Sequence, residues 1–533
     1  MTAKGLFRVL IADKISLDGL APLRDDPRFQ LNEQQGLAGE ALARAIEPVD
    51  AVIVRSATKI PREALAYATR LKVIGRAGVG VDTIDVAAAT ERGIAVLNAP
   101  AGNTVSAAEL TFALMLARVR RIAAADRSMR AGEWARSNFG GTEVYGKKLG
   151  LIGAGRIGGE VARRARAFGM QVIVYDPYLT EERAEALDVH LGSLDEVLSS
   201  ADVLSLHVPL TEATTGLIGR DQFARMKPTA IIVNAARGEV IDEDALVEAL
   251  REKRIAGAAL DVYVHEPLPA DHPLRSFDTV VLTPHLGAST AEAQANVALE
   301  IAEAVRAALV EGDLSRAVNA PAIGGEAARR MRPMLDLARR LGALAAAMAE
   351  GPVRRVDVRY AGEGDDALRP LAATALVGVL ENVVGSSYVN YVNALHLATA
   401  RGIDVRQTRL GPNVDYAEYL EVRLGHKGDE IRIGGALLGA HARLVAIGDY
   451  RVNIEPRGTL VLLRNRDVPG VIGRVGTLLG NAGVNIAEYH QARLEAGGVA
   501  LGAINADGRL SAEICSALRA LPEMLDVRQV QLG

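Results

Sequence analysis

Cysteine is nearly absent, since the 533-residue sequence contains only Cys515. A single thiol cannot form an intramolecular disulfide, and it cannot supply the several cysteine ligands of a structural metal site. We therefore expect neither a disulfide framework nor a cysteine-built metal site, and we assign no metal-ligating residues.

Long apolar runs are missing as well. Charged residues interrupt each apolar stretch well before the roughly 18 residues that a membrane-spanning helix needs. The N-terminal segment MTAKGLFRVLIAD leads directly into a strand-like pattern and lacks the apolar core of a secretory signal. We therefore expect a soluble cytoplasmic protein with no membrane span.

The sequence also lacks a basic tail and any block of lysine and arginine. Its formal net charge is −4 at pH 7, so there is no electrostatic reason to expect a nucleic acid partner. The length exceeds the usual size of a single core and predicts about three or four domains.

The first third of the chain alternates short apolar runs with alanine-rich segments of helical length. The runs RVLIAD, DAVIVRS, LKVIGRAG and IAVLNAP are typical of buried strands, and the alternation predicts βαβ units on a parallel sheet. A second series of this kind begins at KKLGLIGAGRIGG and ends at TVVLTPH. After residue 325 the pattern changes to charge-rich helices and alternating strands, and residues 456–533 show a β-α-β-β-α-β pattern.

A glycine motif opens the second series. Gly153, Gly155 and Gly158 form G-x-G-x-x-G between a strand and a helix, and the next strand ends in Asp176. These glycines permit a tight turn, close approach of a pyrophosphate and close packing of helix on strand. A carboxylate at Asp176 can accept hydrogen bonds from a ribose diol and would repel a 2′-phosphate, which favours NAD over NADP. The alternative is a tight turn without a ligand.

Three later segments of this series deliver polar residues at or just beyond strand ends, namely Arg237, Glu266 and His285. In such folds the carboxyl ends of the strands open on the ligand crevice, so we expect these side chains to converge there. A histidine can exchange a proton near neutral pH, a carboxylate can orient it, and an arginine can grip a substrate carboxylate. Taken singly, each could instead be an ion-pair partner, a turn residue or a strand-end polar group.

Three other histidines compete for these roles. His207 ends a strand, and His265 and His272 flank Glu266 in the segment HEPLPADH. This segment is not the H-E-x-x-H of a helical zinc site, because its prolines prevent that helix. We expect these three histidines to have supporting roles in the structure.

The ordered motifs GRAGVGVDTID, GLIGAGRIG, NAARGEVIDEDAL, LDVYVHEP and TPHLGAST resemble those of the D-isomer-specific 2-hydroxyacid dehydrogenases, roughly over residues 5–320. In that family the motif arginine, glutamate and histidine are catalytic, and they correspond here to Arg237, Glu266 and His285. The resemblance implies NAD as cofactor. The cofactor contacts that it implies are at Gly153, Gly155, Arg156, Ile157, Gly158, Asp176, Val208, Ala235, Asp261, His285 and Gly287.

Within this family the segments VIVRSATKI and VIGRAGVGVD are most similar to those of long-type members that oxidise 3-phospho-D-glycerate to 3-phosphooxypyruvate with NAD, the step that commits carbon to serine. Two guanidinium groups after strands, at Arg55 and Arg76, would suit a phosphorylated acid. The resemblance implies substrate contacts at Arg55, Ser56, Arg76, Gly78, Arg136 and Arg237. Arg136 matches a position that reaches a neighbouring subunit, which implies a homodimer or homotetramer.

Two other functions stay open at this point. One is a dehydrogenase of glyoxylate or hydroxypyruvate, which Arg55 and Arg76 disfavour. The other is a non-enzymatic NAD-dependent sensor that keeps the fold, which the intact catalytic set disfavours without excluding it.

The family fold implies an α/β protein with a Rossmann-type NAD-binding domain (residues 100–287) inserted in a flavodoxin-like substrate domain (1–99 and 288–320). The segments NAPAGNT and LGAST would be the hinges between them. An α+β intervening regulatory domain (321–455) and a ferredoxin-like ACT domain (456–533) would follow.

The segment LRNRDVPGVIGRVGTLLGNAGVNIAEYH carries the resemblance to ACT domains, which bind amino acids between paired subunits. The matching positions are Asn465, Asp467 and Asn485, and the expected effector is L-serine. The alternative is a dimerisation module without a ligand. The basic residues of the intervening segment, including Arg443 and Arg451, fit an anion site and a solvated face equally well.

Overall fold

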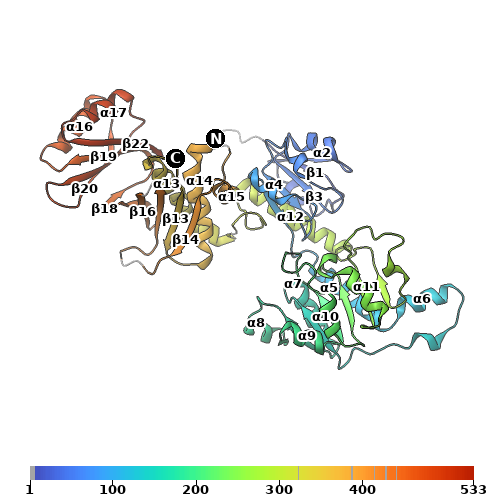
Figure 1. Ribbon diagram of the computed structural model, residues 1–533. Coiled ribbons are helices and arrows are strands. Elements are labelled where there is room, and N and C mark those ends of the chain that lie inside the picture. Colours follow the sequence, from blue (N-terminus) through green and yellow to red (C-terminus); the bar gives the residue numbers. More distant parts are fainter. Residues whose placement is uncertain are drawn as a thin grey trace.

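The computed structural model describes residues 6–321, 323, 325–385, 388–412, 415–426, 429–439 and 441–532. Within these residues the strands form four sheets, which follow one another along the chain (Figure 1). No helix of this described part combines the length and the apolar character needed to cross a bilayer.

The first sheet has five parallel strands in the order β2-β1-β3-β4-β5, which is the flavodoxin-like order. Its strands are β1 (Phe7–Ile11), β2 (Phe29–Glu33), β3 (Ala51–Val54), β4 (Val73–Arg76) and β5 (Ala95–Asn98). The helices that accompany it are α1 (Ala21–Arg24), α2 (Gly39–Ile46), α3 (Arg62–Leu65), α4 (Val86–Glu91) and, from later in the chain, α12 (Ala291–Glu311).

Helix α12 packs so closely on this sheet that β4 needs a glycine. A Cβ added to Gly75 would lie 2.9 Å from Val305 Cγ2 and 3.0 Å from Ile301 Cγ1. The five-stranded sheet, its helices and α12 together are called the first lobe below.

The second sheet has seven parallel strands in the order β12-β11-β10-β9-β6-β7-β8. Its strands are β6 (Lys148–Ile152), β7 (Gln171–Tyr175), β8 (His190–Leu191), β9 (Val203–Leu206), β10 (Ile231–Asn234), β11 (Gly257–Leu260) and β12 (Val280–Leu282). The accompanying helices are α5 (Thr104–Val119), α6 (Ile122–Arg130), η1 (Arg136–Phe139), α7 (Arg156–Ala167), α8 (Glu181–Ala186), α9 (Leu194–Ser200), α10 (Arg220–Arg225), η2 (Gly238–Val240), α11 (Glu243–Arg251) and η3 (Pro273–Ser276).

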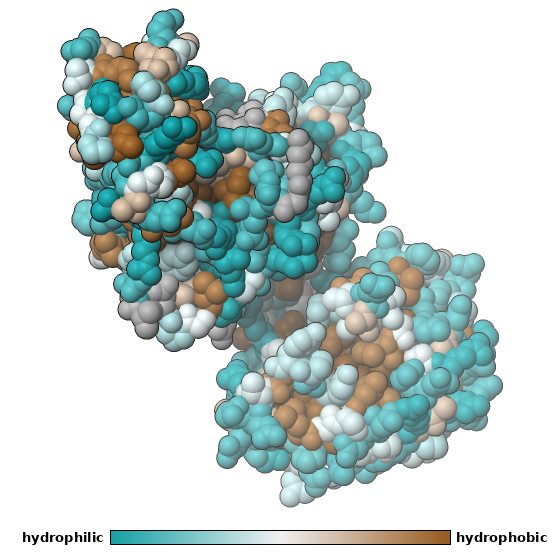
Figure 2. Space-filling view, turned by 60° about the vertical axis from the view of Figure 1, so that its left-hand side comes forward, coloured by the Kyte–Doolittle hydropathy of each residue, from teal (hydrophilic) through white to brown (hydrophobic). Residues whose placement is uncertain are grey.

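This sheet and its helices, called the second lobe, form the Rossmann-type unit that the sequence predicts. Strands β9, β10 and β11 are buried along their whole length, which explains their continuous apolar sequences. The strand order reverses between β6 and β9, and ligand crevices open at such a switch point. Figure 2 shows a patch of hydrophobic residues on this lobe within a largely hydrophilic visible surface.

The third sheet has six strands in the order β14-β13-β15-β16-β17-β18, of which β13 and β14 are parallel and the others antiparallel. Burial alternates residue by residue along β15, because one face packs on helices and the other does not. Its strands are β13 (Arg355–Ala361), β14 (Asp404–Arg409), β15 (Tyr419–His426), β16 (Asp429–Leu438), β17 (His441–Ile447) and β18 (Tyr450–Ile454). Its helices are α13 (Gly325–Met348), η4 (Asp365–Ala367), α14 (Leu368–Val384) and α15 (Ala394–Ala400).

The fourth sheet is antiparallel with the order β20-β21-β19-β22, which with its two helices gives the predicted ferredoxin-like fold. Its elements are β19 (Gly458–Arg466), α16 (Val471–Asn481), β20 (Ile486–Arg493), β21 (Val499–Ala506), α17 (Ala512–Arg519) and β22 (Met524–Leu532). The face away from the helices joins the hydrophobic core of the third sheet through Leu460, Leu462 and Ala503. The two C-terminal units therefore share one core.

The third unit also contacts the first lobe, at the turn that precedes α15. Asn390 Nδ2 donates a hydrogen bond of 2.8 Å to the carbonyl oxygen of Gly93, just beyond α4. Val392 lies in the hydrophobic core formed by β1, β3 and α12. This contact joins the C-terminal half of the chain to the first lobe.

Helices α13 and α14 cross at two glycines that bring their backbones together. A Cβ added to Gly342 would lie 2.1 Å from the carbonyl oxygen of Ala375, and one added to Gly378 would lie 1.9 Å from that of Arg339. Backbone atoms cannot move aside as a flexible side chain can, so both positions require glycine.

We expect Gly378→Ala to lower the free energy of unfolding by about 1–3 kcal/mol, because overpacking forces the two helices apart. Gly473→Ala on α16 is the matched control, since no atom lies within 4 Å of the Cβ it would add. Denaturant unfolding followed by circular dichroism measures both variants. Equal stability of Gly378→Ala and the unmodified protein would contradict the helix crossing described here.

Candidate active site

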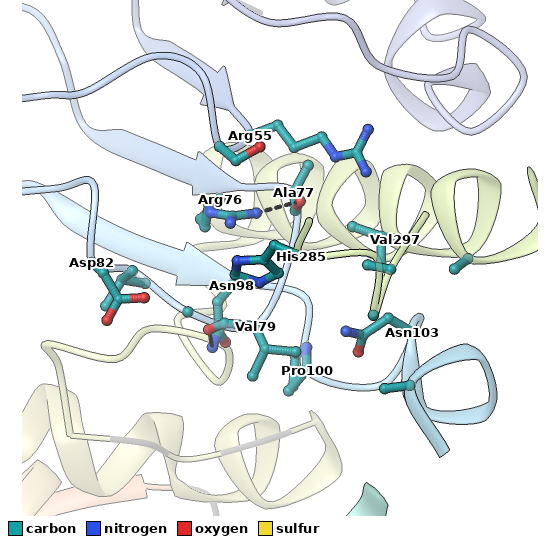
Figure 3. A pocket seen from close by; sticks show the side chains of 18 of the residues that line it. Arg55, Arg76, Ala77, Val79, Asp82, Asn98, Pro100, Asn103, His285 and Val297 are labelled. Carbon is teal, nitrogen blue, oxygen red and sulfur yellow. Dashed lines mark hydrogen bonds between the residues drawn. The ribbon is translucent and has the colours of Figure 1, made fainter. Parts of the chain in front are cut away.

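A cleft of about 670 Å³ lies between the two lobes, at the carboxyl ends of their parallel strands. Side chains from both lobes line it, and Figure 3 shows His285 lying between Arg76 on one side and Val79 on the other. The cleft therefore brings together residues from loops far apart in the sequence. The predicted residues that line it are Arg55, Ser56, Arg76, Gly78, Arg156, Ile157, Val208, Ala235, Arg237, Glu266, His285 and Gly287.

The G-x-G-x-x-G loop has the shape that a pyrophosphate requires. Gly153 has a φ of +89°, and a Cβ there would lie 2.6 Å from the carbonyl oxygen of His207. A Cβ on Gly158 would lie 2.2 Å from the carbonyl oxygen of Gly153, so the first and third glycines are needed for close packing. Around Gly155, in contrast, no atom lies within 4 Å of the added Cβ, which leaves room for a ligand at the N-terminus of α7.

Asp176 lies immediately after β7 and beside this loop. Its Oδ2 accepts a hydrogen bond of 2.9 Å from the backbone N–H of Ala154, and its Oδ1 accepts one of 2.9 Å from that of Tyr178. The carboxylate is partly exposed. Asp176 therefore stabilises the glycine loop. Its place at the end of β7 is the one from which a carboxylate can reach a ribose diol in such folds.

His285 and Glu266 form the central hydrogen bond of the cleft, with 2.8 Å between His285 Nδ1 and Glu266 Oε2. The second carboxylate oxygen, Oε1, accepts a hydrogen bond of 3.1 Å from the backbone N–H of Tyr263. His285 has a φ of 55°, an uncommon conformation for a residue other than glycine, and it directs the imidazole out of the turn after β12.

The pair alters the proton affinity of both groups. The hydrogen bond to Glu266 raises the pKa of His285 above its ordinary value, and this outweighs the opposing effects of burial and of Arg237. Burial alone would raise the pKa of Glu266, but the hydrogen bond and the charge of His285 lower it overall. The carboxylate therefore stays ionised and favours the protonated imidazole.

Asp261 is completely buried and holds the turn that carries His285 through hydrogen bonds. Its carboxylate accepts hydrogen bonds from Thr283 Oγ1 at 2.6 Å and from the backbone N–H groups of Leu286 and Gly287 at 2.7 and 2.9 Å. Burial raises its pKa against these hydrogen bonds. Its carboxylate faces the backbone of residues 286 and 287 and does not line the cleft, so contact of Asp261 with the cofactor stays a prediction.

Arg237 follows β10 in a turn shaped by the buried side chain of Asn234, whose Nδ2 donates to the carbonyl oxygen of Arg237 at 2.8 Å. Arg237 Nη1 donates to the carbonyl oxygen of Ala236 at 2.6 Å. Its Nε lies 3.3 Å from Asp82 Oδ2, on the first lobe. A guanidinium of the second lobe therefore reaches across the cleft.

Arg55 and Arg76 are the guanidinium groups of the first lobe. Burial, and next the positive charges of Arg237 and Arg55, lower the pKa of Arg76 to about 10, so it stays charged at neutral pH. Arg76 Nη1 donates to the carbonyl oxygen of Ala77 at 2.6 Å, and its buried Nε has no partner among the described residues. Buried Asp13 anchors the Arg55 turn through hydrogen bonds from the backbone N–H groups of Arg55 and Thr58.

The geometry thus combines a dinucleotide loop, a histidine–carboxylate pair and three arginines in one cleft. Comparisons with known proteins agree with it. A family model for the D-isomer specific 2-hydroxyacid dehydrogenase, NAD binding domain, matches residues 112–287, and one for the D-3-phosphoglycerate dehydrogenase intervening domain matches residues 330–448.

The D-3-phosphoglycerate dehydrogenase of Archaeoglobus fulgidus is 41% identical over 527 residues, which cover 98% of this chain and 100% of that protein. That of Bacillus subtilis is 39% identical over 529 residues, which cover 99% of this chain and 100% of that protein. This chain belongs to the D-3-phosphoglycerate dehydrogenase family.

Solved structures resemble the two lobes. The TT0316 protein from Thermus thermophilus aligns with a TM-score of 0.53 and 38% identity, over 57% of this chain and 97% of that one. The NAD-dependent formate dehydrogenase from Staphylococcus aureus, in complex with NAD, aligns with a TM-score of 0.51 and 31% identity, over 57% of this chain and 96% of that one. The predicted fold class, an α/β protein of the D-2-hydroxyacid dehydrogenase fold with C-terminal sheets consistent with an ACT-type domain, is confirmed. The prediction of an NAD-dependent dehydrogenase is confirmed as well.

The sequence predictions missed several residues of the cleft. Lys14 and Ser16 line it just beyond β1, and Asp82 and Asn103 line it from loops after β4 and β5. The position of Lys14 three residues after a parallel strand was the available signal. Asn103 and Asp82 lie further from their strands and give no such signal.

Of the remaining histidines, His207 lines the cleft, while His265 and His272 do not. His207 Nε2 lies 2.9 Å from Ser205 Oγ, and burial lowers its pKa to about 4, so it is neutral at pH 7. His272 lies 3.0 Å from Glu243 and accepts the backbone N–H of Leu274 at the start of η3. His265 is exposed. Among the described residues no group of three histidine, cysteine or carboxylate side chains could hold a metal ion.

Arg136 does not line the cleft of its own chain. It lies exposed in η1, which follows α6 in the segment that projects from the second lobe (Figure 1). Large apolar side chains are also exposed along this segment, with Trp134 83% and Tyr145 78% accessible. Any contact of Arg136 with substrate would therefore involve another subunit.

The three predicted effector residues lie at two ends of the fourth sheet. Asp467, beyond the end of β19, accepts hydrogen bonds from Arg493 and from the backbone N–H of Gly497, while buried Asn465 bonds Gln491. Asn485, before β20, donates to Asp507 at 2.8 Å. Asp467 pairs with Gly498 and Asn485 with Asp507, so the two positions are roughly 30 Å apart at about 3.4 Å per residue. One chain alone does not bring the three residues together.

We expect Glu266→Gln to lower the pKa of His285, because the hydrogen bond to a carboxylate is what raises it. A reaction that needs the protonated imidazole loses rate as pH rises through that pKa, so the alkaline limb for ketoacid reduction should move to lower pH. At pH 8 the reduction rate should fall on the order of 10²-fold. Profiles of kcat/KM against pH measure this.

Asp271→Asn is the matched control for that variant, since Asp271 is an exposed carboxylate on the same loop. It should leave the profile unchanged. An unshifted alkaline limb in Glu266→Gln would contradict the coupling of the pair.

Proposed function

We propose that this chain oxidises 3-phospho-D-glycerate to 3-phosphooxypyruvate with NAD, and that His285, Glu266 and Arg237 perform the reaction. The observation that supports this most directly is the 2.8 Å hydrogen bond of His285 to Glu266 in a cleft that Arg237 also lines. The family membership of the chain supports the same reaction.

His285 accepts the proton of the substrate hydroxyl. Its Nδ1 is engaged with Glu266, so Nε2 is the nitrogen left for the substrate, and the neutral ring can accept a proton there. The resulting imidazolium is stabilised by Glu266 beside it. NAD bound at the glycine loop would supply the acceptor for the hydride of C2, so that loss of the proton to His285 and of the hydride leaves the ketone.

The arginines recognise the two anionic ends of the substrate. Arg237 holds the carboxylate next to the reacting carbon, and Arg55 and Arg76 hold the phosphate on the first lobe. The mutual repulsion that contributes to the lowered pKa of Arg76 is relieved when a phosphate enters. The same residues disfavour hydroxyacids that lack a phosphate, because these would leave the guanidinium groups of Arg55 and Arg76 uncompensated. Ser56 and Gly78, which line the cleft beside them, complete the phosphate site.

The dinucleotide site takes NAD rather than NADP. Gly153, Gly155 and Gly158 form the pyrophosphate cradle, and Arg156 and Ile157 lie at the start of α7 beside it. Asp176 would accept hydrogen bonds from the hydroxyl groups of the ribose diol and would repel a 2′-phosphate. Val208, Ala235 and Gly287 line the part of the cleft next to His285.

A comparison of 3-phospho-D-glycerate with D-glycerate tests the substrate assignment. We expect a strong preference for the phosphorylated acid, and Arg76→Gln should lower kcat/KM for it by roughly 10 to 100-fold, the worth of a charge-assisted hydrogen bond. Arg92→Gln, an exposed arginine of the same lobe, should have no effect. Equal kcat/KM for the two substrates in the unmodified protein would contradict the proposal and favour a hydroxypyruvate-type enzyme.

L-serine regulates the reaction at a site formed by two ACT domains. Because Asp467 and Asn485 lie at opposite ends of the sheet of one chain, a site that uses both has to combine one end of each of two chains. Asn465 contributes from the strand beside Asp467. The assembly is therefore a homodimer or homotetramer, in which Arg136 also reaches the substrate of a neighbouring subunit.

Serine inhibition of turnover tests this regulation. We expect L-serine to inhibit the unmodified protein, and Asn485→Ala to raise the inhibitory concentration by about tenfold through loss of one hydrogen bond to the effector, without changing the uninhibited rate. Asn481→Ala, at the end of α16, is the matched control. Activity that does not change with L-serine would contradict this regulation and favour the alternative, in which the ACT domain is a dimerisation module without a ligand.

We assign the four sheets to a substrate domain (residues 1–99 and 288–320), an NAD-binding domain (100–287), an intervening domain (321–455) and an ACT domain (456–533). The segments NAPAGNT and LGAST are the hinges across which the cleft closes. The enzyme acts in the cytoplasm.

A further inference from the structure

One ion pair crosses the cleft between the two lobes. Asp82 belongs to the glycine-rich loop after β4 of the first lobe, and Arg237 follows β10 of the second. Asp82 Oδ2 lies 3.3 Å from Arg237 Nε, and the side chains are 58% and 26% exposed. Asp82 of the first lobe therefore contacts Arg237, a residue of the proposed reaction, which belongs to the second lobe.

The loop that carries Asp82 is shaped around this guanidinium. A Cβ added to Gly80 would lie 1.9 Å from Arg237 Nη2 and 3.0 Å from its Cζ. The φ of Gly80 is not in the left-handed region, so its backbone does not require glycine. Asp82 Oδ2 would lie 2.5 Å from the same Cβ, so both partners of the ion pair lie close to Gly80 and leave no room for a side chain.

Ala236, Asp82 and Gly80 contact different nitrogen atoms of the guanidinium. Nη1 donates to the carbonyl oxygen of Ala236, and Nε faces Asp82. Nη2 lies over Gly80. Together they determine the plane of the group, and a fork with a defined plane can bind a carboxylate in a bidentate geometry.

The charge of Asp82 also has a function at this position. Arg76 and Arg237 are close enough for each charge to act on the other, and Asp82 is a carboxylate that acts on both. Without it, Arg237 would be pushed away from Arg76 and out of the cleft. An exposed ion pair contributes little to stability, so the value of this one lies in orientation.

We infer that Asp82 is a positioning residue for the dehydrogenase reaction, which holds Arg237 across the cleft in the orientation that binds the substrate carboxylate. This inference rests on the proposed role of Arg237. It also links closure of the lobes to assembly of the site, because the two partners belong to different lobes.

A double-mutant cycle on kcat/KM for 3-phospho-D-glycerate tests it. Asp82→Asn keeps the shape of the side chain and removes the charge, and it should lower kcat/KM on the order of 10 to 100-fold, as expected for a misplaced substrate-binding group. In an Arg237→Lys background, where the planar fork is already lost, the same substitution should cost less than about twofold. The dissociation constant for NADH should stay unchanged in Asp82→Asn.

Asp85→Asn is the matched control, because it removes a charge from the same loop, keeps a residue able to cap α4 and does not contact Arg237. It should leave kcat/KM unchanged. Gly80→Ala provides a second variant, whose added methyl group should separate Arg237 from Asp82, since it would lie against both, and reproduce the loss seen for Asp82→Asn.

The outcomes are distinguishable. Equal losses for Asp82→Asn in both backgrounds would overturn the inference and leave the role of Arg237 intact. Tighter substrate binding by Asp82→Asn would also overturn it, since Asp82 would then occupy the place of the substrate carboxylate. Full activity of Arg237→Lys alone would instead refute the proposed function of Arg237.

Discussion

The hydrogen bond between His285 Nδ1 and Glu266 Oε2 is the interaction on which the rest of the cleft depends. It determines which imidazole nitrogen faces the substrate and how strongly that nitrogen holds a proton. Much of the nearby structure keeps it in place. Asp261 binds the turn that carries His285, and the hydroxyl group of Tyr263 donates to the carbonyl oxygen of Thr283 at 2.9 Å. Burial of the Asp261 carboxylate costs free energy, and the several hydrogen bonds that it accepts offset this cost.

The second constraint is electrostatic. Three guanidinium groups share the cleft and repel one another, and the lowered pKa of Arg76 reflects their proximity together with burial. Asp13 and Asp82 offset part of this charge from positions around it, and a substrate with a carboxylate and a phosphate would offset the remainder. The same charges that limit the stability of the cleft therefore favour the binding of a phosphorylated acid.

The sequence predicts much of this arrangement because of one rule of parallel sheets. Polar residues that follow buried strands meet at one edge of their sheet, so Arg237, Glu266 and His285 could be expected together on the second sheet, and Arg55 and Arg76 together on the first. The rule gives the place of a residue but not the direction of its side chain. Asp261 follows β11 as Arg237 follows β10, yet its carboxylate lies beneath a loop.

Other features have no local signal. Asp82 lies several residues beyond β4, and its partner is distant in the sequence, so only the folded chain reveals the ion pair. The contact of Asn390 with Gly93 is of the same kind, since no motif marks either residue. The arrangement of Asn465, Asp467 and Asn485 depends on strand direction in the fourth sheet, which separates residues that a motif comparison groups together.

Substitution of His285 by alanine tests the central claim most directly, when turnover and cofactor binding are measured on the same preparation. The account predicts that turnover of 3-phospho-D-glycerate falls by at least about 10²-fold, because the proton acceptor is lost. The dissociation constant for NADH, measured by calorimetry, should remain within about twofold, because the dinucleotide loop lies on other elements. Retained turnover, or an equal loss of turnover and NADH binding, would contradict the account.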